Sequence, residues 1–248
     1  MMNNKNAIFT LIMKSRFALA SIVAAACWFS SCDEGDIHPA EVGSDLSGSR
    51  IVHLTATITG ADALPQGYSL VLAGFEDGAD YTALQKAVTV SDDGRIDLTL
   101  TAPSELLNFE LCVTNSVRKR IVTLASVTAD GAGEVEFPVG TTDVSGLALV
   151  QRAVFTPSCA SCHGVASARN ANLCLAEGQS AANLVGVASQ RVLGAQRVQP
   201  GQPSASVLHQ VIDSNIPEVA MPHADILDAK KKGDLLDLID AWILIINY

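Results

Sequence analysis

Two cysteines and a histidine lie within five residues, in the segment Cys159-Ala-Ser-Cys162-His163. The C-x-x-C-H spacing places the two thiols about one helical turn apart, so both can add to the vinyl groups of one porphyrin. The imidazole of His163 then lies under the iron. The segment therefore predicts one covalent haem c, held by Cys159 and Cys162 and ligated by His163.

Two other chemistries use a Cys-x-x-Cys pair. A four-cysteine zinc site needs a second pair, and the only other cysteine nearby is the isolated Cys174. A site of two cysteines and two histidines would use His163, but its position directly after Cys162 gives poor tetrahedral geometry. A thioredoxin-like redox pair needs a preceding strand and a βαβ frame, and neither pattern is visible. The haem interpretation is favoured, with zinc and redox sites as its alternatives.

Composition and charge limit the class of protein. The chain has 248 residues, 48% hydrophobic and 17% charged, which is enough for two small domains. The formal net charge is −10. The first 31 residues hold three basic side chains and no acid, so the remainder carries 13 basic against 26 acidic side chains, or −13. This excess repels nucleic acid and anionic headgroups, so we expect no nucleic-acid partner.

Residues 1–31 have the pattern of a targeting signal. Lys14 and Arg16 precede an apolar run that is too short for a membrane span, and small residues then lead to Cys32. The pattern resembles a bacterial lipoprotein signal, in which Cys32 is lipidated; Cys27 is a second candidate, and an ordinary secretory signal is the alternative. Residues 32–49 are polar and predict a flexible tether. We expect a lipid anchor in the envelope of a Gram-negative-type bacterium, on the periplasmic face or the cell surface.

Residues 50–143 predict an all-β, immunoglobulin-like antiparallel sandwich, because short runs alternate apolar and polar residues between turns. Asp92-Asp93-Gly94 predicts a hairpin. The basic cluster 118–120 is interpreted as a solvated turn or a contact point, and a disulfide between Cys112 and Cys174 is an open alternative. The predicted strands are 51–59, 68–75, 85–90, 95–100, 106–114, 119–126 and 133–137.

Residues 144–248 predict a second, all-α domain. Residues 147–155 have helical spacing and Pro157 is expected to end that helix, while residues 231–245 form a second amphipathic pattern. A helix, a C-x-x-C-H segment and a terminal helix with Trp242 together resemble class I cytochrome c. The resemblance implies an all-α cytochrome c haem domain that follows the sandwich.

The resemblance also implies a sixth iron ligand. Once the signal is removed, Met221 is the only methionine, and it precedes a proline in a loop before the terminal helix, where the family places its distal thioether. We expect Met221 to ligate the iron, with His223 as its rival and His209 as a weaker candidate. Arg197, or Arg191, is expected to pair with a haem propionate.

The chain departs from the family in one respect. Many cytochromes c offer a proline carbonyl to the free nitrogen of the proximal histidine, but no proline occurs between Gly164 and Gln199. That partner cannot be assigned from the sequence, although one is expected to fix the ring.

An iron held by an imidazole and a thioether favours outer-sphere one-electron exchange. The sequence therefore predicts a membrane-anchored, non-enzymatic electron carrier that docks with a redox partner protein. The alternatives are a haem enzyme or a gas or redox sensor with a labile distal ligand, and a sandwich that acts as a binding module with an accessory haem.

Overall fold

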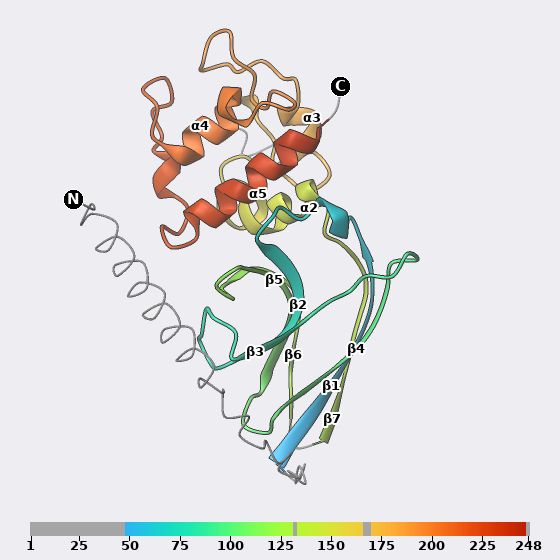
Figure 1. Cartoon of the computed structure of the whole chain (residues 1–248). Helices are drawn as coiled ribbons and strands as arrows, with labels where there is room; N and C mark the ends of the chain where they lie inside the picture. Colours follow the sequence, from blue (N-terminus) through green and yellow to red (C-terminus); the bar gives the residue numbers. More distant parts are fainter. Residues whose placement is uncertain (1–47, 131–132, 166–169, 247–248) are drawn as a thin grey trace, which may run out of the picture. The chain divides into compact units, whose positions relative to one another are not determined.

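The computed structural model describes residues 48–130, 133–165 and 170–246, and it groups Leu46–Tyr248 as one compact unit (Figure 1). The predicted signal 1–31, Cys32 and nearly all of the tether lie outside the described residues. Among the described residues, no helix has the length and apolar character needed to cross a membrane.

The first sheet has three strands in the order β4-β1-β7. Strand β1 (Ser49–Thr59) alternates buried and less buried residues, as the sequence pattern predicts. It pairs antiparallel with β4 (Arg95–Pro103) but parallel with β7 (Gly133–Asp143). The expectation of a purely antiparallel sandwich is therefore wrong. The β1–β7 register shifts at Thr55/Ala56, opposite Pro138, which has no N–H to donate to the ladder.

The second sheet has four antiparallel strands in the order β3-β2-β5-β6. The two central strands are buried almost throughout, because one face packs on the main core and the other forms a small cluster. That cluster consists of Val71, Ala73, Phe75 and Cys112. The strands are β2 (Tyr68–Phe75), β3 (Leu84–Ala87), β5 (Asn108–Asn115) and β6 (Arg120–Thr128).

The predicted hairpin at Asp92-Asp93-Gly94 is a turn between sheets. The turn closes with a 2.8 Å hydrogen bond from Gly94 N to Ser91 O, and Gly94 has a φ of 79°. The strands on either side, β3 and β4, belong to different sheets. The turn chemistry is therefore as predicted, but the hairpin is wrong because the chain crosses the sandwich.

The helices are short apart from the last one. Helix α2 (Gly146–Val150) continues directly into a π-helix, η3 (Gln151–Cys159), which contains Pro157. Pro157 was expected to end the helix; the wider turn of a π-helix accommodates it instead. The remaining elements are η2 (Ala61–Ala63), η4 (Asn170–Asn172), α3 (Ser180–Leu184), η5 (Pro203–Ala205), α4 (Val207–Asp213), η6 (His223–Asp225) and α5 (Lys232–Ile245).

The predicted fold class is wrong, because no distinct all-α domain is present in the described part of the chain. One continuous core runs from the sheets through α2, η3, α4 and α5. No linker separates the two parts: Val144 N donates to Thr59 O at 2.9 Å, and α2 begins two residues later. Short helices bury too little surface among themselves, so their apolar faces share a core with the sheets.

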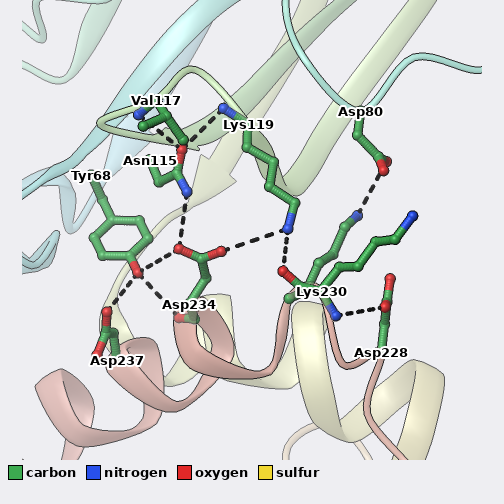
Figure 2. A network of polar contacts seen from close by, with 10 residues as sticks. Tyr68, Asp80, Asn115, Val117, Lys119, Asp228, Lys230, Asp234 and Asp237 are labelled. Atoms are coloured by element: carbon green, nitrogen blue, oxygen red, sulfur yellow. Dashed lines mark hydrogen bonds and ion pairs between the residues drawn. The ribbon is translucent and has the colours of Figure 1, made fainter.

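A polar network joins the second sheet to the start of α5 (Figure 2). Asp234 accepts hydrogen bonds from Tyr68 at 3.1 Å and Asn115 at 3.0 Å. Lys119 is buried, lies 3.9 Å from the same carboxylate and donates to the carbonyl of Lys230. The basic cluster 118–120 is therefore not simply a solvated turn: Lys119 ties the sheet to the helix.

Candidate functional site

The C-x-x-C-H segment lies on the turn that ends the π-helix η3. Phe155 anchors this helix: it is fully buried, and its ring meets that of Trp242 edge to face at 6.2 Å. The helix closes with a bond from Ala160 N to Phe155 O at 2.8 Å, and His163 N donates to Cys159 O at 2.9 Å. The thiols of Cys159 and Cys162 are free.

An apolar pocket opens beside this turn. Cys159 and His163 line one side of it, and Arg197 and His223 also reach it. A second pocket shares Cys159, His163 and His223 and adds Cys162 and Met221. The aliphatic lining of the first pocket includes Leu173, Leu175, Leu184, Val207, Leu208 and Ile212.

The ring of His163 is fixed by a backbone carbonyl. Nδ1 donates to Asn170 O at 3.0 Å, and because a carbonyl can only accept, the neutral ring keeps Nε2 unprotonated. Burial lowers the pKa of His163, which favours this neutral form. The carbonyl of Asn170 takes the place of the proline carbonyl that the sequence lacks. Sequence reasoning missed it because a backbone carbonyl carries no residue signature.

The thiol environment does not favour the two alternatives to haem. Burial raises the pKa of Cys159 to about 11, whereas a redox dithiol needs a depressed value. Among the described residues, the only cluster of three donors with metal-ligand spacing is His53, Glu134 and Glu136, on the β1–β7 pair. The C-x-x-C-H segment is thus not gathered into a zinc-like donor set.

Arg197 is a buried cation in the wall of the first pocket, with 8% of its surface exposed. Its guanidinium donates to Asn183 O at 2.8 Å and Ala171 O at 2.9 Å, and burial lowers its pKa. Among the described residues it has no carboxylate within salt-bridge distance. A buried charge that only carbonyl dipoles compensate favours an anionic group on the ligand. Arg191 lines both pockets but is exposed.

The three candidates for a sixth ligand lie in different environments. Met221 is 51% exposed and lines only the second pocket, whereas His223 lines both. His209 Nδ1 lies 2.7 Å from Asp240 and joins α4 to α5, so it is engaged away from the pockets. The structure therefore brings Cys159, Cys162, His163, Arg197, Met221 and His223 together and leaves His209 out.

Gln151 is a structural residue that the sequence analysis missed. Its side chain is buried, donates to Leu175 O at 2.9 Å and accepts from Ser180 Oγ at 2.8 Å. Leu175 N in turn donates to His163 O at 2.5 Å. These bonds hold the pocket wall against the histidine. The disulfide alternative is wrong, because Cys112 and Cys174 are both buried free thiols.

Comparison with known proteins gives no family. No family model matches the sequence, and no curated protein is significantly similar to it. Among solved structures, a leucine-rich repeat protein from Bacteroides thetaiotaomicron is 9% identical, with a match that covers 38% of this chain and 12% of that protein. The TM-score of 0.19 carries no argument about fold or function.

Proposed function

We propose that this protein is a c-type cytochrome that carries one covalent haem and transfers single electrons between protein partners. The observation that carries the proposal is that Cys159 and His163 line the apolar pocket and, together with Cys162, the second pocket, with His163 Nδ1 held by the carbonyl of Asn170. Two free thiols and an imidazole with an unprotonated Nε2 are the groups that attach and ligate haem c.

The other residues around the pocket fit a haem. A porphyrin needs an apolar cavity for its ring and a polar end for its propionates, and the first pocket supplies aliphatic walls with Arg197 among them. Arg197 lacks a carboxylate partner in the described part of the chain, so a propionate would compensate its buried charge. Cys159 and Cys162 would hold the vinyl side, and His163 would ligate the iron.

A bound haem would supply one-electron exchange between ferric and ferrous iron. The chain's own residues set the conditions for that exchange. The aliphatic walls offer apolar surface to the porphyrin ring, and the bond from His163 to Asn170 fixes the imidazole and keeps Nε2 available. Gln151, through Leu175, holds the wall that carries the histidine. A preorganised site limits the rearrangement that accompanies electron transfer.

The location and partner are part of the same proposal. Lipidation at Cys32 would anchor the chain in the cell envelope, and the acidic composition favours a basic or neutral redox protein over nucleic acid. Such electron-transfer contacts are small and transient. The helical segment would not act as a module apart from the sandwich, because the two share one core.

The test is a pyridine haemochrome assay on the full chain produced with cytochrome c maturation machinery. We expect one haem c per chain, and complete loss of covalent haem in the double variant Cys159→Ser/Cys162→Ser. The matched control is Cys112→Ser/Cys174→Ser, which removes two buried thiols outside the C-x-x-C-H segment. Cys112 lies in strand β5 and Cys174 lies between the pocket-lining residues Leu173 and Leu175, and this variant should retain the haem. Colourless wild-type protein, or equal haem content in both double variants, would contradict the proposal.

A further inference from the structure

We propose that Nε2 of His223, rather than the thioether of Met221, is the sixth ligand of the iron. The inference rests on the proposed haem and specifies its coordination: two imidazoles on opposite faces of one porphyrin. The position and hydrogen bonding of His223 carry it.

The rings of His163 and His223 lie close together and nearly parallel, and both residues line the two pockets. Their centroids are 6.1 Å apart and their planes differ by 25°. An imidazole nitrogen binds a metal at about 2.0–2.1 Å, so two imidazoles on one ion have centroids roughly 6 Å apart. Direct stacking in van der Waals contact would bring the rings closer than this. The separation therefore matches that of two imidazoles whose in-plane Nε2 atoms bind one ion.

The second nitrogen of each ring is held in the same way. Nδ1 of His223 donates to Met221 O at 2.8 Å, as Nδ1 of His163 donates to Asn170 O at 3.0 Å. In a neutral ring this leaves Nε2 unprotonated. No hydrogen bond engages either Nε2 within the described residues. A histidine whose Nδ1 bonds a backbone carbonyl is the usual arrangement for a metal ligand.

The local chain favours His223 over Met221. His223 begins the short helix η6 directly after Pro222, whose ring restricts the backbone at this point. His223 lines both pockets, while Met221 lines only the second pocket and leaves half of its surface exposed. Met221 contributes its backbone carbonyl instead, which orients the imidazole two residues later.

The ligand changes what the haem would do. A thioether raises the reduction potential of a haem, so a second imidazole in its place lowers the potential. The reduced protein could then pass its electron to acceptors whose reduction potential is too low for a cytochrome with imidazole and thioether ligands to reduce. Both faces of the iron would be closed, which disfavours the enzyme and gas-sensor alternatives.

The experiment compares the matured full chain with Met221→Leu and His223→Gly. Each sample is first assayed for haem c with pyridine, so that loss of the haem, which would refute the proposed function, is distinguished from a change of ligand. Ferric spin state and the near-infrared band of thioether-ligated ferric haem are then recorded. We expect low-spin wild type without the band, an unchanged Met221→Leu spectrum, and loss of the wild-type low-spin signature in His223→Gly that added imidazole restores.

Three results would overturn the assignment. The first is a thioether band in the wild type that disappears in Met221→Leu. The second is a His223→Gly protein whose ferric spectrum is unchanged from that of the wild type. The third is high-spin iron in the wild type, which would mean that His223 does not bind.

Discussion

Replacing Lys119 by Met tests whether the sheets and the helices unfold as one unit. Lys119 leaves 8% of its side chain exposed, and Asp234 leaves 19%. Removing the ammonium takes away the donor to Lys230 O and the cation 3.9 Å from Asp234. A lost hydrogen bond to a charged group costs about 1.5–3 kcal/mol. Because Asn115 and Tyr68 still bond Asp234, we expect a loss of about 2 kcal/mol in the free energy of unfolding.

Urea unfolding of the full chain measures this loss with two probes. Far-ultraviolet circular dichroism reports strands and helices together, while fluorescence of Trp242, the only tryptophan after the predicted signal, reports α5. Because one core spans both parts, we expect both probes to give one midpoint and the variant to lower both equally.

The matched control is Lys231→Met. Lys231 also lies 3.9 Å from a carboxylate, that of Asp80, but the two side chains are 24% and 41% exposed. An ion pair this exposed contributes at most about 1 kcal/mol, so the control should change the midpoint little. Two separate wild-type transitions, or a Lys119→Met variant that moves only the Trp242 signal, would refute the shared core.

Three further variants test other parts of the structure. Gly60→Ala should lower the free energy of unfolding by about 2 kcal/mol or more in urea titrations, because φ of Gly60 is 75° and a Cβ would lie 2.6 Å from Ser145 N. An unchanged urea midpoint would contradict the close approach of Gly60 to Ser145. The pKa of His53 is raised by hydrogen bonds to carboxylates on β4 and β7, so its stabilising effect is present below its ordinary value of 6.5 and is lost as pH rises through the raised value. The urea midpoint of His53→Gln should therefore fall below that of the wild type at pH 5.5 and approach it at pH 8.5, and a constant difference would contradict the ion pairs. Arg197→Leu should lower the free energy of unfolding by about 1–3 kcal/mol, because the carbonyls of Ala171, Asn172 and Asn183 lose their donor. It should also lower the reduction potential of the proposed haem by removing a nearby cation, and potentiometry that finds no change would argue against the propionate contact.

Local patterns in the sequence predicted local structure. Alternation located β1, helical spacing located α5, and the C-x-x-C-H spacing marked the candidate site. These signals depend on neighbours in the chain, so they do not require knowledge of the tertiary structure. The same applies to the turn at Gly94, which is where the sequence placed it.

Longer-range features were beyond the sequence. An apolar helix face predicts that the helix is packed against another element but does not identify that element. The sequence therefore suggested that α2 and α5 form a separate helical domain, although they share a core with the sheets. The turn at Gly94 fixes a reversal but not the sheet that the next strand joins. The contact of His163 with Asn170 is local, but it uses a backbone carbonyl, which no residue type marks. The approach of His223 to His163 depends on how segments far apart in the sequence meet around the pocket.

The intact mass of the matured chain under denaturing conditions tests the central claim most directly. Thioether bonds survive denaturation, so the account predicts a chain heavier by one haem, and the mass of the unmodified chain once Cys159 and Cys162 are both changed to Ser. Wild-type protein with no added haem mass, although it was matured in a host that attaches haem to a control cytochrome c, would contradict the account.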